Sequence, residues 1–391
     1  MAPLRCREPA GQTKIRVAQV VTSVVLGGGG QVISAIARHL DRAAFEMDVF
    51  CIIEGGELVD YIQSQGFNVA VIPVRTRGSR PHYSLSAWLQ LTSMLRRRKY
   101  DVVHTHLYHA DLVGGVSARI AGCRVVVKTL HNMGTRRTSF QHAIEVMVLN
   151  RIARKIICVS RSQANHLLKH GGMDPSKLVT IHNGVDASRF RAPRDKAASA
   201  ISVGLDPSKP VVGTVGRLIE EKGHEYLLQA VPLIARRVPG VQFLIVGDGP
   251  LRHDLERRIL QLRDTRVVIT GLRSDVPELL GLMDLFVFPS LSEAFGIAVI
   301  EAMAAGVPVA CADIPALNET VRRGVTGEIF PGQDPEALAA SVCTLLENAD
   351  LRRSLAERAQ NWVRESFTES AMVRAYERVY REQVCRTTRY P

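Results

Sequence analysis

The chain has 391 residues and a net charge of +12 at pH 7, with 46% hydrophobic and 23% charged residues. This composition is typical of a folded α/β protein, and the length exceeds the ~250–300 residues at which one core usually divides, so two domains are expected. No apolar run approaches the roughly 20 residues of a membrane span, and the N-terminal stretch lacks the apolar core of a signal peptide, so we expect a cytoplasmic protein.

The first expected strand leads into a run of four glycines. Residues 14–21 form an apolar strand pattern, Gly27 to Gly30 follow, and a helical pattern covers residues 32–40. Strand, glycine loop and helix is the order that cradles a phosphate, because glycine lets backbone N–H groups approach an anion closely. The run lacks the spacing of the dinucleotide fingerprint, so NAD binding is not expected.

Short apolar runs then recur with helical segments between most of them, which predicts a doubly wound parallel sheet. Polar residues follow these runs at the carboxyl ends of the expected strands, where such a sheet binds its ligands. The runs cover residues 47–53, 69–74, 101–104, 125–130 and 155–160, and the polar residues are His104, His106, His131, Asn132 and Ser160.

Neither the histidines nor the cysteines have the pattern of a metal site. His104, His106 and His109 would scatter over a strand end and a loop, and Asp111 is the only carboxylate between His104 and His131. The seven cysteines are dispersed and odd in number, so we expect free thiols in place of disulfides or zinc.

An asparagine-glycine turn marks the expected domain boundary. Residues 182–186 read His-Asn-Gly-Val-Asp, and a polar, proline-containing, aperiodic stretch follows. We therefore expect a first domain at residues 1–186 and a second at residues 187–366.

Two cations follow the first strand of the second domain. Arg217 and Lys222 flank the turn after residues 211–215, where a planar fork and a compact charge would hold a diphosphate. A surface role at a helix start is the alternative, but cations are favoured at helix C-termini. Further strands are expected at residues 242–246, 267–270, 285–288, 307–310 and 328–330.

Glycines end several of these strands. A flat nucleotide base can lie close against the backbone where side chains are missing. The residues concerned are Gly216, Gly247, Gly271 and the adjoining Leu272.

Residues 286–312 read as strand, loop, helix and strand. Unpaired N–H groups at the helix N-terminus predict an anion site. Glu293 and Glu301 frame this site. Carboxylates beside a phosphate are favourable only if they accept hydrogen bonds from hydroxyl groups. The combination therefore indicates a sugar phosphate. Either glutamate alone would be read as a helix cap or a solvated face, but Glu301 has apolar neighbours. The expected anion contacts are Phe295, Gly296 and Ile297.

Residues 293–309 read Glu-Ala-Phe-Gly, four residues, then Glu-Ala-Met-Ala-Ala-Gly-Val-Pro-Val. This pattern resembles the glutamate-pair motif of the family 4 retaining glycosyltransferases of the GT-B fold. The chain departs from the family at Ala294, where glycine is usual, and at residues 313–319. By the order of its motifs the resemblance spans residues 14–380.

The resemblance implies two Rossmann-like domains facing a cleft, with a terminal helix at residues 367–391 crossing back to the first. It implies that Glu301 binds the ribose hydroxyls, Glu293 the donor-sugar hydroxyls, and His131 the sugar near its reacting carbon. The catalytic residues would be Arg217, Lys222, Glu293 and His131, and Gly28 and Gly29 would lie against the diphosphate and acceptor.

We therefore predict a retaining, metal-independent transfer of a hexosyl unit from a UDP- or GDP-sugar to a hydroxyl acceptor, in polysaccharide or glycolipid synthesis. No cofactor is expected, since the nucleotide sugar is a substrate. Two alternatives stay open: a nucleotide-sugar 2-epimerase of the same fold, and a non-catalytic nucleotide-sugar binder.

The positive charge is unevenly distributed. Residues 1–190 hold 25 Lys and Arg against 12 Asp and Glu, whereas residues 191–391 hold 25 against 26. An anionic membrane surface carrying a lipid-linked acceptor is the expected partner of the first half. The helix around Trp88 is read as core-facing, and nucleic acid is not expected, because aromatic content is only 5%. The basic clusters are Arg75, Arg77 and Arg80; Arg96 to Lys99; Arg136 and Arg137; and Arg151, Arg154 and Lys155.

Overall fold

The computed structural model describes residues 14–389 apart from residues 26, 75–83, 134–140, 142–143, 171–172, 191–194 and 263–264. The clusters at Arg75 to Arg80 and at Arg136 and Arg137 therefore lie outside the described residues. The chain forms two compact units, one of residues 1–182 and 369–391 and the other of residues 183–368.

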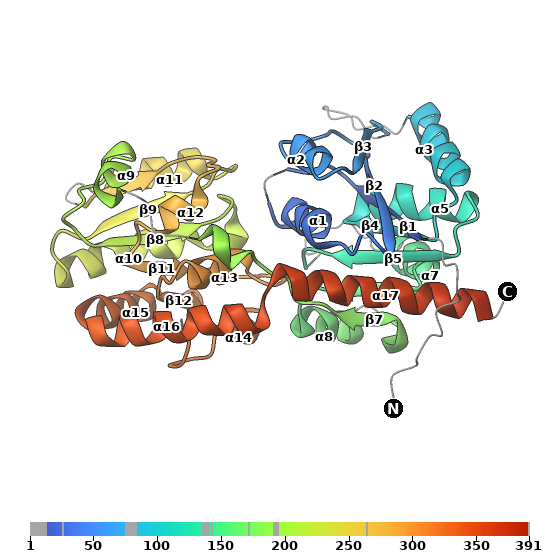
Figure 1. The fold of residues 1–391 in the computed structure, drawn as a ribbon. Coiled ribbons are helices and arrows are strands. Elements are labelled where there is room, and N and C mark those ends of the chain that lie inside the picture. The colour runs from blue at the N-terminus through green and yellow to red at the C-terminus, as the bar shows by residue number, and fades with distance from the viewer. Residues whose placement is uncertain are drawn as a thin grey trace. The chain divides into compact units, whose positions relative to one another are not determined.

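Seven strands form the sheet of the first unit in the order β3-β2-β1-β4-β5-β6-β7, and every pair is parallel (Figure 1). A sheet covered on both faces needs apolar residues at nearly every position, which is why its strands read as apolar runs. The strands are β1 (Ile15–Val21), β2 (Phe45–Cys51), β3 (Asn68–Val71), β4 (Val102–His106), β5 (Val125–Leu130), β6 (Lys155–Cys158) and β7 (Leu178–Thr180).

Helices cover both faces of this sheet. Val17 and Val127 belong to one core with α1 and α17, whereas Val20 and Val126 belong to a second core with α3 and α5. The helical elements are α1 (Gly28–His39), α2 (Val59–Ser64), α3 (Leu85–Arg98), α4 (Tyr108–Ala110), η1 (Asp111–Gly115), α5 (Val116–Ile120), η2 (Glu145–Leu149), α7 (Asn150–Ile152), α8 (Arg161–His170), η3 (Pro175–Lys177) and α17 (Glu369–Arg389).

The second unit has a six-stranded parallel sheet in the order β10-β9-β8-β11-β12-β13. Its strands are β8 (Val211–Val215), β9 (Gln242–Val246), β10 (Val267–Ile269), β11 (Leu285–Phe288), β12 (Val309–Ala312) and β13 (Glu328–Phe330). Its helical elements are η4 (Ala187–Arg189), α9 (Lys196–Ser202), η5 (Glu220–Lys222), α10 (His224–Arg237), α11 (Arg252–Ile259), α12 (Val276–Leu280), α13 (Ile297–Ala304), α14 (Leu317–Thr320), α15 (Pro335–Glu347) and α16 (Ala349–Ser366). The two doubly wound parallel sheets confirm the predicted fold class.

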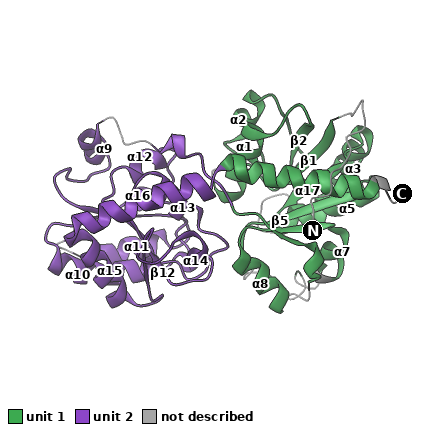
Figure 2. Ribbon diagram, turned by 60° about the horizontal axis from the view of Figure 1, so that its bottom comes forward, with its two compact units in different colours: residues 1–182, 369–391 green, residues 183–368 purple. Residues whose placement is uncertain are grey.

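The terminal helix α17 belongs to the first unit, with which it shares its colour in Figure 2. Its Tyr376 and Tyr380 are fully buried. Its Glu369 carboxylate accepts a hydrogen bond from the Arg38 guanidinium at 2.7 Å, and Glu377 accepts one from the backbone N–H of Asp41 at 2.8 Å. These contacts tie the last helix of the chain to α1 and to the segment that follows it.

Several expected element boundaries differ from those of the structure, and two of the differences have a clear physical reason. The terminal helix begins at Glu369, because Phe367 caps α16 and its ring packs edge-on against Phe295 at 5.7 Å between centroids. The expected strand at residues 69–74 ends at Val71, and the apolar run continues because Ile72 and Val74 are buried in the core beyond the strand. No helix within the described residues has both the length and the hydropathy of a membrane span.

Candidate functional site

The two predicted cations of the second unit differ in their surroundings. Lys222 ends the turn η5, its Nζ donates to Glu293 Oε1, and it lies 4.9 Å from the centroid of the Phe288 ring. The guanidinium of Arg217 is exposed and makes no hydrogen bond or ion pair with the described residues. The charge of Lys222 is therefore balanced within the protein, whereas none of the described residues balances that of Arg217.

The loops after β8 and β11 are joined at several points. Ser290 Oγ donates to Glu293 Oε1 at 3.0 Å, and the backbone N–H of Leu291 donates to Glu221 O at 2.8 Å. Together with the Lys222 contact, these bonds place Glu293 at the carboxyl end of β11, beside the turn that follows β8. The structure thus brings together two of the four predicted catalytic residues.

Gly223 allows this approach of the two loops. Its φ of 64° is in the left-handed region, and a Cβ built on it would lie 2.1 Å from the carbonyl oxygen of Pro289. Any other residue would force the turn that carries Lys222 away from the loop after β11.

Three predicted glycines of the second unit, Gly216, Gly247 and Gly271, follow neighbouring strands of its sheet. Gly247 forms an isolated bridge with Gly271, and a Cβ on Gly247 would lie 1.9 Å from the carbonyl oxygen of Gly216. Leu272, next to Gly271, is 64% exposed, which is unusual for a large apolar side chain. The three glycines and Leu272 therefore form a backbone-lined surface at the same edge of the sheet.

The second predicted glutamate, Glu301, lies on α13 and is only 8% exposed. Gly296 caps this helix with φ at 90°, and a Cβ there would lie 2.5 Å from Leu317 Cδ2. Phe295 is buried, and Ile297 is the first residue of α13. The first N–H groups of a helix have no intrahelical partner, so the α13 N-terminus provides the predicted donors.

In the first unit, His131 follows β5 and faces the N-terminus of α1. A Cβ built on Gly29 would lie 3.9 Å from His131 Cδ2, so the glycine loop and this histidine are neighbours. Gly28, the first residue of α1, is exposed. The structure therefore groups the three site residues predicted for the first domain.

A buried polar network behind His131 was missed from the sequence. His131 Nε2 contacts His106 Nδ1 at 2.9 Å, and His106 Nε2 contacts Gln19 Oε1 at 2.9 Å. Gln19 Nε2 donates to the Tyr380 hydroxyl at 3.1 Å. The same hydroxyl lies 2.6 Å from His104 Nδ1, and His104 Nε2 lies 2.7 Å from Thr129 Oγ1.

One signal in the sequence could have found part of this network. His104 and His106 alternate on β4 and so share a face, and Gln19 on β1 pairs in register with His104. Three polar residues on the inner face of otherwise apolar central strands require partners.

Burial keeps the histidines of this network neutral. It lowers the pKa of His104 to about 3 and that of His131 to about 4. At His104, the electrostatic effect of His131 adds to that of burial. The pKa of His106 is held well below its usual range by burial and then by the two adjacent histidines. In the second unit, burial beside Lys222 lowers the pKa of His224 to about 4.

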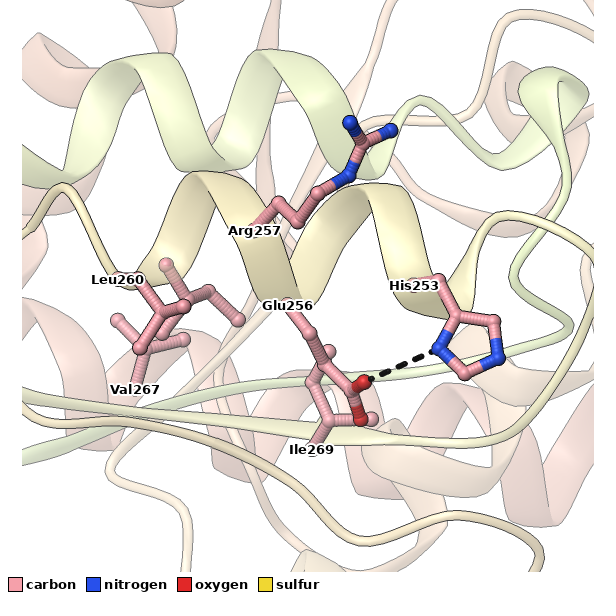
Figure 3. Close-up of a pocket in the computed structure, with 7 residues that line it drawn as sticks. His253, Glu256, Arg257, Leu260, Val267 and Ile269 are labelled. Atoms are coloured by element: carbon pink, nitrogen blue, oxygen red, sulfur yellow. Dashed lines mark ion pairs between the residues drawn. The ribbon is translucent and has the colours of Figure 1, made fainter.

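A hollow of about 480 Å³ lies away from these residues, between α11 and the edge strand β10 (Figure 3). Val267, Ile269 and Leu260 form its apolar part, and His253 pairs with Glu256 at 3.6 Å beside it. None of the predicted site residues lines it.

Comparisons with known proteins agree with the two-unit organisation. Residues 26–189 match the family model described as Glycosyltransferase Family 4, and residues 209–348 match the model described as Glycosyl transferases group 1. The chain is 29% identical over 333 residues to the UDP-Gal:alpha-D-GlcNAc-diphosphoundecaprenol alpha-1,3-galactosyltransferase of Escherichia coli, covering 82% of this chain and 85% of the relative.

Two further similarities are informative. A D-inositol 3-phosphate glycosyltransferase of Mycobacterium sp. (strain KMS) is 32% identical over 282 residues, which cover 66% of this chain and 62% of the relative. Among solved structures, Anabaena Alr3699/HepE in complex with UDP and glucose has a TM-score of 0.82 and 23% identity, covering 94% of this chain and all of that one. This likeness identifies the fold as GT-B.

Replacing Gly223 by alanine is expected to destabilise the second unit more than replacing Gly324. Both glycines have positive φ, but a Cβ on Gly324 meets nothing within 4 Å. We expect Gly324→Ala to cost roughly 1–2 kcal/mol from the left-handed backbone, and Gly223→Ala to cost about 1–3 kcal/mol more from the clash with Pro289. Urea unfolding of both variants measures the difference, and equal midpoints would contradict the close approach.

The buried histidines should make the protein acid-sensitive. Folding lowers the pKa of these histidines. Below the unfolded histidine pKa of about 6.5, the unfolded protein therefore binds more protons than the folded protein does. Their stabilising contribution is then complete above that pH and falls as pH drops from about 6.5 towards 4.

His224→Gln tests this directly, with the exposed His253→Gln as its control. His224→Gln should reduce the slope of the unfolding free energy against pH by up to about 1.4 kcal/mol per pH unit between about pH 6.5 and 4. Urea unfolding between pH 4 and 7.5 provides the measurement. Identical slopes in both variants would mean that folding does not lower the pKa of His224.

Proposed function

Because the chain belongs to glycosyltransferase family 4, we propose that it transfers a hexosyl unit from a UDP-sugar to a hydroxyl group of a lipid-linked glycan. Galactose from UDP-galactose is the first donor to test, since the Escherichia coli relative uses UDP-Gal and an acceptor on diphosphoundecaprenol. The observation that carries the proposal is the pairing of Lys222 with Glu293 beside the unpaired Arg217.

The donor diphosphate would exchange the partner of Lys222. Glu293 pairs with Lys222, whose ammonium lies over the Phe288 ring. A diphosphate carries two negative charges, which the planar guanidinium of Arg217 and the compact ammonium of Lys222 can match. Glu293 is then free to accept hydrogen bonds from the sugar hydroxyls, so donor binding would assemble the sugar site as well as the phosphate site.

The surrounding loops suit the rest of the nucleotide. The backbone surface of Gly216, Gly247 and Gly271, with the exposed Leu272, fits a flat base. We assign the ribose hydroxyls to Glu301, because it lies on the helix that follows the loop of Glu293 and a carboxylate accepts hydrogen bonds from hydroxyl groups. We assign the diphosphate oxygens that Arg217 and Lys222 leave free to the α13 N-terminus.

The reaction would break the bond between the anomeric carbon and the diphosphate and form a bond from that carbon to the acceptor oxygen, whose proton passes to the departing phosphate oxygen. Negative charge then grows on the departing phosphate oxygen while the sugar gains oxocarbenium character. Preorganised cations stabilise the growing charge more than they stabilise the bound substrate, and so they lower the barrier. His131, Gly28 and Gly29 of the first unit would serve the sugar and its acceptor.

Removing either cation should slow turnover more than it weakens acceptor binding. We expect Arg217→Ala and Lys222→Ala each to reduce kcat by about 30- to 1,000-fold, equivalent to ~2–4 kcal/mol, with a smaller change in the acceptor KM. The exposed Arg236→Ala in the same unit is the matched control. Turnover of both site variants within twofold of the parent, assayed with UDP-galactose and a lipid-linked GlcNAc acceptor, would defeat the assignment.

The transfer is expected to proceed without a divalent metal and with retention of anomeric configuration. The two cations supply the charge that a metal would otherwise provide, and the sequence contains no Asp-x-Asp triplet. Activity should persist in EDTA, and proton NMR of the first product should show the α-anomer from an α-linked donor. Loss of activity in EDTA that magnesium or manganese restores, or an inverted product, would overturn this mechanism.

The first unit offers a surface suited to an anionic membrane. On η2 and α7, Met147 is 56% exposed, Val148 is also exposed, and Arg151 and Arg154 follow with exposed side chains. Apolar and basic side chains together on a helical surface are typical of interfacial binding. Other predicted cations serve the fold instead: Arg98 pairs with Asp48 at 2.7 Å, and α3 packs Leu91 and Leu95 into the core.

Binding to anionic vesicles should depend on this surface. Each basic residue near an anionic leaflet contributes about 1 kcal/mol, so Arg151→Ala with Arg154→Ala should weaken binding by about tenfold or more at low salt. Arg236→Ala is again the control. Co-sedimentation with vesicles containing anionic lipid measures the effect, and equal binding to neutral vesicles would mean that charge has no part in it.

A further inference from the structure

The hydrogen bonds behind His131 form one continuous chain that passes through α17 and ends on β5. In order, the chain runs from His131 to His106, Gln19, Tyr380, His104 and Thr129, with contacts between 2.6 and 3.1 Å. All members behind His131 are buried. No other hydrogen bond to the His131 ring is made by the described residues.

The amide of Gln19 gives this chain a direction. Its nitrogen donates to the Tyr380 hydroxyl, so its oxygen must accept a hydrogen bond from His106 Nε2. A neutral imidazole carries one hydrogen, which leaves His106 Nδ1 as an acceptor. His131 Nε2 therefore donates to His106, and His131 Nδ1 is left with a free lone pair.

The other half of the chain agrees with this direction. The Tyr380 hydroxyl accepts from Gln19, so its own hydrogen is available to His104 Nδ1. His104 then carries its hydrogen on Nε2 and donates to Thr129 Oγ1. Reversing the Gln19 amide would reverse every bond and place a hydrogen on His131 Nδ1.

Packing alone does not require these polar groups. The ring of Tyr380 packs edge-on against Phe45 at 6.1 Å between centroids, and a phenylalanine would fill the same space. α17 is also held to the first unit by the Arg38 and Asp41 contacts at its first and third turns. The Tyr380 hydroxyl and the Gln19 amide are therefore the parts of the hydrogen-bond chain whose presence packing does not explain.

We propose that Gln19 and Tyr380 are positioning residues that hold His131 as the neutral tautomer with hydrogen on Nε2 and a lone pair on Nδ1. His131 thereby presents a hydrogen-bond acceptor, which selects a ligand group that donates, namely a sugar or acceptor hydroxyl. The choice of hydroxyl as the ligand rests on the proposed glycosyl transfer, whereas the tautomer follows from the described contacts alone. Through Tyr380, the last helix of the chain would control the chemistry of a residue that follows β5.

The test uses the full chain with ¹⁵N-labelled histidine and long-range ¹H–¹⁵N correlation spectra, with His131→Gln to assign the signals. In the parent protein we expect a protonated Nε2 and an unprotonated Nδ1 on His131. In Tyr380→Phe, Gln19 loses its acceptor and can turn, so the two His131 nitrogen shifts should move towards each other as both tautomers become populated. Gln19→Leu should have the same effect and serves if the first variant does not fold.

Tyr100→Phe is the matched control, because Tyr100 is buried in the same unit and its hydroxyl donates to Asp48, outside the chain of bonds to His131. It should leave the His131 shifts unchanged. In the transfer assay, kcat of Tyr380→Phe should fall about twofold if the tautomers become equally populated and further if their order inverts, with little change in the donor KM.

Several outcomes would overturn the proposal. A hydrogen on Nδ1 of His131 in the parent would refute the tautomer. Unchanged shifts in both Tyr380→Phe and Gln19→Leu would refute the role of the hydrogen-bond chain. A lower kcat without a change of tautomer would also refute it, because it indicates a structural effect. If no donor is turned over, the shifts still decide the tautomer while the proposed function alone fails.

Discussion

The parallel direction of every strand pair is the constraint on which this structure depends. All strands of a parallel sheet end at the same edge, so residues far apart in the sequence meet there. In the second unit this edge gathers the loop of Lys222 after β8, the glycine turns after β9 and β10, and the loop of Glu293 after β11. In the first unit it places His131 beside the glycines that begin α1.

Electrostatics then decides which charged residues of the second unit are held in pairs. The Lys222 and Glu293 pair is mostly shielded from solvent, whereas Arg217 is exposed and unpaired among the described residues. An isolated buried cation would be costly, and an isolated buried carboxylate equally so. The pair therefore keeps both groups charged and in place, and in the proposed mechanism a diphosphate and sugar hydroxyls replace the contact between them.

The sequence predicts the strands and singles out the polar residues of the second unit for a physical reason. Strands buried on both faces are apolar throughout, and Lys222, Glu293 and Glu301 stand out because polar residues beside such runs require partners. The strand β7 was missed because its three residues are half-buried and carry little pattern. The predicted donor-contact roles of these residues stay predictions, since they concern a bound ligand.

The missed features depend on contacts between distant residues. Gln19 and Tyr380 are 361 residues apart, and nothing local to either shows that they share a hydrogen bond. The pairing of Lys222 with Glu293 likewise joins two residues that were predicted separately as a phosphate ligand and a sugar ligand. Residue types were thus accessible from the sequence, whereas their partners required the fold.

The most direct test of the central claim is whether UDP is released only when an acceptor is present. The protein would be incubated with UDP-galactose, with and without a lipid-diphosphate-linked GlcNAc, and both nucleotide and glycan would be followed by NMR. The account predicts acceptor-dependent release of UDP, with one galactosyl unit appearing on the glycan for each UDP formed. Conversion of UDP-GlcNAc to UDP-ManNAc without any acceptor would contradict it and identify an epimerase instead.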